Sequence, residues 1–238
     1  MKAVFFFLIL STLMLTSCKK DPVVRMIDLT YQPNVSASNF TNPTVITNQY
    51  YPLAEGKIYR YEGQTADGFE VVEERRLNTT RVVQGITCVI SNFKAYLNGN
   101  LIEEAEDWFA QDNAGNVWYF GERVDNYNPD GTLKDHGGSW EAGVDGAKAG
   151  IIMPATPTLG MKYREEYYFN EAEDEAEITG VNLNVSIPLG QYNNVIRTQN
   201  WTELEPDLLE EKYYAPGVGL IKEVHLGDNT EIVLVSIL

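Results

Sequence analysis

Short strand-like runs recur along most of the chain and constrain its fold more than any other sequence feature. In each run, apolar and polar residues alternate, or β-branched and aromatic residues predominate, as is typical of strands with a buried face. No stretch combines helical periodicity with caps, although Asp174–Ile178 is compatible with one helical turn. The sequence therefore predicts an all-β fold of antiparallel sheets. The runs are Lys57–Gln64, Phe69–Leu77, Ile86–Tyr96, Leu101–Ala110, Val117–Val124, Lys162–Phe169, Asn194–Leu204, Glu210–Tyr214, Leu220–Leu226 and Glu231–Ile237.

Turn-forming residues separate many of these runs. Asn98 and Gly99 give the strongest hairpin signal, because this dipeptide suits positive φ at both central positions. Asn113–Gly115 predicts a further turn. Asn126–Gly131 resembles the first half of a calcium loop, but Gly137 stands where a bidentate glutamate is required. We therefore interpret this segment as a hairpin turn and expect no metal there.

Two pairs of segments resemble each other at nearly the same separation. Gly56–Glu62 matches Gly160–Glu166 at an offset of 104 residues, and Glu106–Ala110 matches Glu211–Ala215 at an offset of 105. Two ordered matches favour an internal duplication into two similar halves. Halves that each expose an apolar sheet face would bury it by packing as a sandwich or by closing an open barrel.

The N-terminus reads as an export signal. Lys2 precedes the apolar run Val4–Leu10, which is shorter than the ~20 residues that a membrane span needs. Leu15, Thr16, Ser17 and Cys18 then match the bacterial lipobox. This resemblance implies cleavage between Ser17 and Cys18 and attachment of diacylglycerol to the Cys18 sulfur. Two or more acyl chains would hold the protein stably on a membrane.

The residue after the acceptor cysteine and the net charge bear on location and partners. Lys19 follows Cys18, in place of the aspartate that resembles an inner-membrane retention signal, so we expect the outer membrane, on either face. Removing residues 1–17 leaves 17 basic and 34 acidic side chains, a formal charge of −17. Such a charge repels nucleic acid and anionic headgroups, so the predicted membrane contact is the lipid anchor.

The predicted organisation has three parts. The segment before residue 51 is rich in Ser, Thr, Asn and Pro, and about 30 flexible residues would reach roughly 30 Å. The remaining chain is long enough for one domain with a sizeable core. The predicted boundaries are 1–17 for the signal peptide, 18–50 for a flexible tether and 51–238 for one β-rich domain, with halves at about 51–124 and 159–238 and a Gly-rich crossover connector at 125–158.

Several stretches resemble an uncharacterised family of secreted bacterial proteins and lipoproteins. They are Asp107–Glu122 (DWFAQDNAGNVWYFGE), Gly138–Ala147 (GSWEAGVDGA) and Gly150–Ala155. The closing Tyr213–Ile221 (YYAPGVGLI) resembles a motif of periplasmic β-domains. The similarity covers most of residues 51–226. It implies a secreted β domain and brings no activity and no functional residues.

The Gly-rich connector holds the candidate binding residues. A long connection between two β halves is where a binding or lid element would lie. In that interpretation Trp140 is an apolar contact, and Glu141 or Asp145 is a polar one. The alternative is an irregular crossover packed on the sheet, whose glycines permit close backbone approach.

Catalytic and cofactor sites have little support in the sequence. Cys88 lies in a β-branched stretch and is predicted to be a buried, inert thiol. His136 and His225 are the two histidines, and the segment around Ser139 lacks the second glycine of a nucleophile elbow, because Glu141 stands there. We therefore expect no catalytic residues, no metal and no cofactor.

One leading hypothesis and two alternatives follow. The leading hypothesis is a lipid-anchored cell-envelope lipoprotein that acts as a non-enzymatic binding or assembly module, with an envelope protein, a glycan or a lipid as ligand. The first alternative is a carrier of an apolar ligand or lipid in a β-barrel mouth. The second is an envelope hydrolase of glycans or peptides, for which the abundant carboxylates would supply the acid and base.

Overall fold

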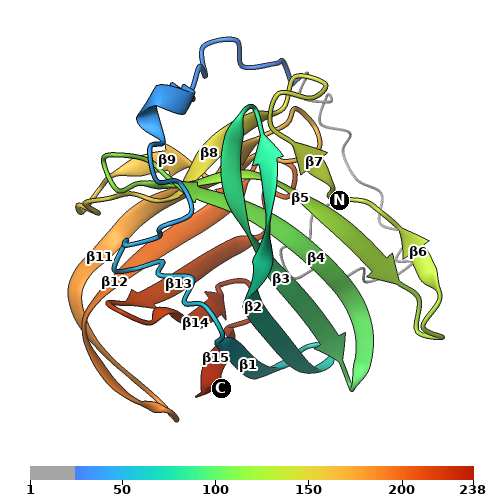
Figure 1. The fold of residues 1–238 in the computed structure, drawn as a ribbon. Coiled ribbons are helices and arrows are strands. Elements are labelled where there is room, and N and C mark those ends of the chain that lie inside the picture. The colour runs from blue at the N-terminus through green and yellow to red at the C-terminus, as the bar shows by residue number, and fades with distance from the viewer. Residues whose placement is uncertain (1–24) are drawn as a thin grey trace, which may run out of the picture.

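The structure is a computed structural model that describes residues 25–238, and nearly all of its regular structure is antiparallel strand (Figure 1). The predicted all-β fold is confirmed. Within these residues no helix is both long and apolar enough to cross a bilayer. The predicted signal peptide and the lipidation site Cys18 lie outside the described residues.

One short 3₁₀ helix, η1 (Ala37–Asn39), precedes the strands. The first meander contains β1 (Ile58–Thr65), β2 (Gly68–Val83), β3 (Ile86–Leu97), β4 (Asn100–Gln111) and β5 (Val117–Tyr127). Five short strands follow, β6 (Leu133–Asp135), β7 (Trp140–Glu141), β8 (Lys148–Met153), β9 (Lys162–Arg164) and β10 (Glu166–Tyr167). The chain ends with β11 (Asp174–Ile187), β12 (Gly190–Thr202), β13 (Leu209–Ala215), β14 (Gly219–His225) and β15 (Thr230–Ile237).

All 15 strands belong to one sheet in the order β10-β8-β5-β4-β3-β2-β1-β15-β14-β13-β12-β11-β9, and β6 and β7 pair with β5. The two ends of this order, β9 and β10, are consecutive in the chain. At one end β9 pairs with β11, and at the other β10 pairs with β8. The segment Lys162–Tyr167 thus joins both ends of the sheet, and the sheet curls into a nearly closed barrel (Figure 1). Of the two predicted architectures, sandwich and barrel, the structure has the barrel. We call the Lys162–Tyr167 segment the seam.

A glycine allows the chain to pass closely at the seam. A Cβ atom placed on Gly150 in β8 would lie 2.4 Å from the backbone carbon of Glu165. Only a residue without a side chain permits this approach of two backbones.

The two pairs of matching segments fall at corresponding places in two successive meanders. Gly56–Glu62 leads into β1, and Gly160–Glu166 leads into β9, the strand that precedes the second meander. Glu106–Ala110 and Glu211–Ala215 lie in β4 and β13, which form hairpins with β5 and β14. The internal duplication itself stays a prediction.

The described part of the predicted tether packs on the barrel, which differs from the expectation for 18–50. Phe40 is buried, with its ring 5.7 Å from that of Phe120 in an edge-to-face arrangement. The amide of Asn48 donates to the carbonyl oxygens of Gly115 and Pro154, at 3.0 and 3.1 Å. A few apolar and amide side chains thus fix a segment whose average composition is typical of a flexible linker.

The predicted crossover loop contains three short strands of the sheet. Its short strands β6, β7 and β8 all pair with β5, so the connector extends the barrel wall. The predicted hairpin turns are present: Asn98 and Gly99 have φ values of 50° and 83° between β3 and β4. The backbone N–H of Asn128 donates to the carbonyl of Thr132 between β5 and β6.

One predicted element has the wrong type. Asp174–Ile178, considered for a helical turn, begins the 14-residue strand β11. Its acidic residues suggest a helix start, but Ala176 and Ile178 are buried at a spacing of two, which is the period of a strand.

The barrel interior combines two hydrophobic clusters with buried acids. The larger cluster includes Phe120 and Met153, the smaller one includes Tyr61 and Leu234, and Leu220 packs against both. Glutamate is almost never fully buried unless it is paired. The buried glutamates are Glu70, Glu103, Glu122, Glu165, Glu166, Glu173, Glu210 and Glu223.

Candidate functional site

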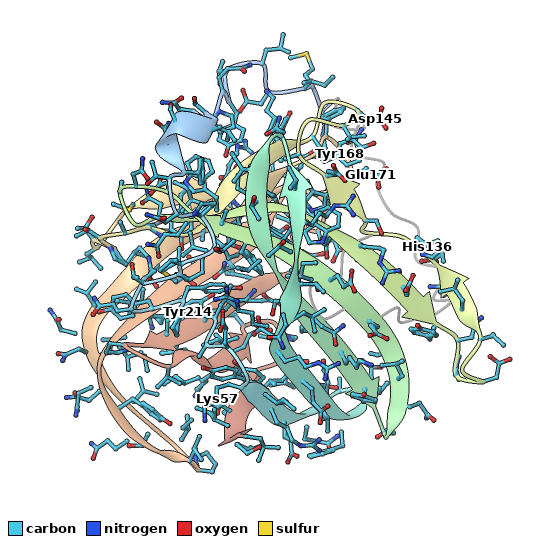
Figure 2. The ribbon with its side chains drawn as sticks, in the orientation of Figure 1. Lys57, His136, Asp145, Tyr168, Glu171 and Tyr214 are labelled. Carbon is cyan, nitrogen blue, oxygen red and sulfur yellow. The ribbon has the colours of Figure 1, made fainter. Side chains whose placement is uncertain are left out.

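The three candidate binding residues of the connector do not surround a common cavity. Trp140 is buried in the larger hydrophobic cluster, where its ring lies edge-to-face with that of Tyr119 at 5.3 Å. Glu141 forms an ion pair with Arg81 at 2.5 Å. Asp145 is exposed at a turn, at the upper end of the view in Figure 2. Adjacent residues of β7 point to opposite sides of the wall, which separates Trp140 from Glu141.

The other residues considered for chemistry have structural roles. Cys88 is fully buried in β3, and burial raises the pKa of its thiol to about 12. The Ser139 hydroxyl accepts the backbone N–H of Val124 at 2.9 Å. His136 is on the outer face, 2.8 Å from Asp125 (Figure 2). The buried position of Cys88 agrees with the predicted buried thiol.

The barrel contains an interior cavity of about 170 Å³ that is partly open to solvent, and its lining combines carboxyl groups with an equal number of apolar and aromatic residues. Eight acids contribute to the lining, and Lys212 is the basic side chain among the described residues that do so. Figure 2 shows Tyr214, which also lines the cavity, near the middle of the barrel. The acids are Glu74, Glu103, Asp107, Glu122, Glu165, Glu166, Asp174 and Glu223.

Strand alternation explains how these acids come to face inward. On β4, Glu103, Ala105 and Asp107 occupy every second position and therefore share a face. Asp107 pairs in register with Glu122 on β5, which points to the same side. We call Glu74, Glu103, Asp107 and Glu122, which lie on β2, β4 and β5, the acid wall.

A second group of charges lies on β13 and β14, and we call it the cation wall: Glu210, Lys212, Glu223 and His225. The Lys212 ammonium is 3.3 Å from the Glu210 carboxylate and 3.6 Å from that of Glu223. Nε2 of His225 is 3.1 Å from Glu223 and 3.4 Å from Glu210. Two bases thus face two buried carboxylates across one strand pair.

The pKa values on the cation wall follow from burial and these contacts. Burial raises the pKa of Glu210, and the neighbouring Glu223 charge raises it further, to about 7. Burial acts in the same direction on Glu223, but Lys212 and His225 outweigh it and hold that pKa below its ordinary value. Burial would lower the pKa of His225, but the hydrogen bond and charge of Glu223 raise it to about 8. Burial and the Glu223 charge raise the pKa of nearby Glu70 to about 8.

The acid wall has the opposite electrostatics. Burial raises the pKa of Asp107 well above its ordinary value, and the neighbouring Glu122 adds to the rise. The Tyr119 hydroxyl donates to Asp107 at 2.7 Å. Burial also raises the pKa of Glu74, which accepts a hydrogen bond from Ser91 at 2.8 Å. Burial therefore favours the protonated forms of Glu74 and Asp107 on this wall.

A second pocket of about 230 Å³, which we call the outer pocket, shares residues with the interior cavity. Asp174 and Lys212 line both, so these two side chains stand between the outer pocket and the acid-lined interior. Asn170, Leu204 and Glu205 also line the outer pocket.

The cation wall also contains a potential set of metal ligands. Ligand atoms of Glu210, Glu223 and His225 lie within 4.8 Å of one another. However, the Lys212 ammonium contacts both carboxylates, and the raised pKa of His225 favours its protonated form, which is not a metal ligand. The internal cations thus fill the role that a metal ion would have, and the residues do not fit a metal centre.

Sequence reasoning did not find this interior site, because its signal is weak. Glu210, Lys212 and Tyr214 alternate with Leu209, Glu211 and Tyr213, so both faces of β13 carry charged and aromatic residues. A period of two indicates a strand here, but it does not show which face is buried.

Comparisons with known proteins find two solved structures with low sequence identity to this chain. No family profile and no curated protein matches the chain. A structure from Bacteroides fragilis, described as an exported protein with a YmcC-like fold, is 14% identical, with a TM-score of 0.48. A structure from Parabacteroides distasonis, described as a lipoprotein, is 13% identical, with a TM-score of 0.42. Each alignment covers 80% of this chain and 99% of the other.

Proposed function

We propose that this protein is an envelope lipoprotein, anchored through Cys18, whose barrel binds a small cationic ligand without chemical conversion. The observation that carries the proposal is the interior cavity, in which eight carboxyl groups face one ammonium. A ligand with amine or guanidinium groups would neutralise the acid wall. Its charge would lower the pKa values that burial has raised there.

The lining favours this ligand class over the apolar ligand of the alternative hypothesis. An acyl chain placed against Glu103, Asp107 and Glu122 would exclude water from the carboxyl groups and offer no hydrogen bond in return. A cation replaces that water with charge-assisted hydrogen bonds, which are about twice as strong as neutral ones.

Isothermal titration calorimetry with matched compounds tests the ligand class. The lipidated protein, extracted in detergent, is titrated with putrescine and with 1,4-butanediol, which has the same chain length and no charge. A second pair is glucosamine and N-acetylglucosamine. We expect binding of the charged member of at least one pair only, with an affinity that falls as salt is added.

Two neighbouring glutamates of β4 provide a variant and its control. Glu103 is buried and lines the cavity, whereas Glu104 is on the outer face and pairs with Lys94 at 3.2 Å. We expect Glu103→Gln to weaken binding on the order of tenfold, the loss of about one charge-assisted interaction, and Glu104→Gln to have little effect. Equal affinity for charged and neutral compounds, or a co-purified lipid in the native mass spectrum, would contradict the proposal.

One observation favours a second candidate, a glycan hydrolase. Asp107, whose pKa is raised well above its ordinary value, pairs in register with Glu122. A protonated acid beside a second carboxyl group is the arrangement that glycoside hydrolysis uses. Turnover of a glycoside panel that is lost in both Asp107→Asn and Glu122→Gln would favour this candidate over pure binding.

Anchoring is tested separately. Intact mass measurement of the protein from bacterial cells should show acyl chains on a chain that begins at Cys18, and the protein should partition into the detergent phase. The Cys18→Ser variant should do neither.

A further inference from the structure

The first described residues are fixed to the rim of the barrel. Arg25 forms an ion pair with Glu173, lies 3.6 Å from Glu203 and donates to the Asn170 side chain at 3.1 Å. Asn170 lines the outer pocket. Arg25 therefore lies beside the opening that leads toward Lys212.

Further contacts hold the next residues in place. The backbone N–H of Asp28 donates to the Tyr167 hydroxyl at 2.5 Å, and the Tyr31 hydroxyl donates to the carbonyl of Ala149 at 2.8 Å. Lys148 in turn donates to the Tyr31 carbonyl at 2.6 Å. Both the seam and β8 thus support this segment, which is ordered against the barrel over residues 25–31.

Three large apolar side chains of this segment point into solvent. Met26, Ile27 and Leu29 are 81%, 56% and 75% exposed. Eleven large hydrophobic residues are exposed among the described residues, and these three lie within four consecutive positions. Single exposed apolar residues need no explanation, but a group of them marks a surface that binds something apolar.

The distance along the chain to the lipid acceptor identifies what covers this surface. Six residues, 19–24, separate Cys18 from Arg25, and a fully extended chain of that length spans at most about 25 Å. The stretch contains Lys19, Lys20 and Asp21, and the charge of Arg25 after it is paired with Glu173. Anchored at Cys18, the exposed apolar group cannot move far from the bilayer.

We propose that Met26, Ile27 and Leu29 insert into the headgroup region of the membrane that holds Cys18, so that the outer pocket opens beside the bilayer. This inference rests on the lipid anchor of the proposed function and goes beyond it, because it fixes the orientation of the barrel. Figure 2 shows Tyr168 and Glu171, which flank Asn170, at the upper end of the view, and Lys57 at the opposite end. The upper end is then the membrane side.

Depth-dependent fluorescence quenching tests the orientation. The full lipidated protein carries a bimane label at Ile27→Cys, and the control carries it at Leu189→Cys. Leu189 is 41% exposed in the β11–β12 turn, which Figure 1 shows at the lower end of the barrel. Cys88 is fully buried, so it does not compete for the label.

The labelled proteins are reconstituted into vesicles of phosphatidylethanolamine and phosphatidylglycerol with and without brominated acyl chains. At a depth of about 5–10 Å into the headgroup and acyl boundary, we expect bromine to reduce emission at residue 27 by about twofold or more, with little change at residue 189. Leu29→Cys provides a second label on the same surface, in case the label at residue 27 perturbs the segment.

The outcomes separate the two proposals. Intact mass is measured first, and an unmodified Cys18 would overturn the anchor and, with it, the inferred orientation. A lipidated protein with no quenching at residues 27 and 29, or with equal quenching at residue 189, would overturn the orientation alone. The orientation would be supported by quenching of the labels at residues 27 and 29. This quenching should be lost when Met26 and the unlabelled member of the pair Ile27 and Leu29 are both replaced with serine.

Discussion

The cation wall and the acid wall line the same barrel, but the pKa values of Glu223 on the first and Asp107 on the second are shifted in opposite directions. On the cation wall, burial raises the pKa of Glu223, and Lys212 and His225 reverse that effect. On the acid wall, burial and Glu122 both raise the pKa of Asp107. The difference between the walls is one ammonium and one imidazole.

This comparison indicates where a ligand contributes most. A buried carboxyl stays ionised where the fold supplies its own base, as Lys212 and His225 do on β13 and β14. On the acid wall, Glu74 and Asp107 accept hydrogen bonds from the Ser91 and Tyr119 hydroxyls. A cationic ligand would supply to that wall the charge that Lys212 supplies to Glu223.

Replacing the ammonium should have the largest effect. Lys212→Met leaves Glu210 and Glu223, which are almost fully buried, without their lysine, and breaking a buried charge pair in this way costs about 3–5 kcal/mol. Urea unfolding at neutral pH measures the loss. The control is Lys94→Met, which removes an ion pair of similar length on the outer face and should cost less than about 1 kcal/mol. Equal losses in the two variants would remove the special role of Lys212.

Neutral replacements of one acid on each wall sharpen the contrast. Glu223 is ionised and hydrogen-bonded, so Glu223→Gln should lower the free energy of unfolding by about 2–3 kcal/mol. Asp107 has a raised pKa and accepts the Tyr119 hydroxyl, which an amide oxygen also accepts, so Asp107→Asn should cost less than about 1 kcal/mol. The reverse ranking in urea unfolding would show that the charge states are assigned to the wrong walls.

Stability should fall as pH rises from mildly acidic to mildly basic values. The pKa of His225 is raised from 6.5 to about 8, so its contribution is complete below 6.5 and is lost as pH rises through 8, about 2 kcal/mol in total. Glu70 and Glu210, with pKa values raised to about 8 and about 7, act in the same direction. Urea unfolding midpoints across this range check the slope.

A pair of histidine variants isolates that effect. His225→Asn should flatten the pH dependence, whereas His136→Asn, at a side chain that is 62% exposed, should leave it unchanged. If the pH dependence of stability persists in His225→Asn but disappears in Glu70→Gln, the acids alone are its cause.

The smallest effects should come from the connector. Glu141→Gln removes an ion pair with Arg81 that is partly exposed, which should cost less than about 1 kcal/mol in urea unfolding. Calorimetry should show unchanged ligand affinity for this variant and for Asp145→Asn. A loss of affinity in either would return the binding site to the connector, away from the interior acids.

The sequence predicts strands well where burial is one-sided and turns are strong. Eleven strands of the fold, β1 to β5, β9, β10 and β12 to β15, overlap predicted runs, and Asn98 and Gly99 form the expected turn. The strand β11 was missed because Glu175 and Glu177 resemble a helix start. The connector strands β6 and β7 were missed because two or three residues carry no measurable period, and their pairing with β5 is a tertiary effect.

The candidate site was less accessible to sequence reasoning. Trp140 and Glu141 are unusual residues in an unusual loop, but one is a core residue and the other is an outer ion pair. The interior acids are ordinary glutamates in ordinary strands, and only the curvature of the closed sheet brings Glu122 and Glu223 to one cavity. Residue type and spacing do not contain that curvature.

The seam has a consequence for how the barrel moves. Its two strands contribute three register pairs to β11 and two to β8, whereas β2 and β3 share eleven. Amide hydrogen exchange should therefore be faster along Lys162–Tyr167 than in β2 and β3, because fewer hydrogen bonds must break there. Glu165 and Glu166 are buried in this segment, so a transient parting of the wall there would hydrate the interior acids without unfolding the rest of the molecule.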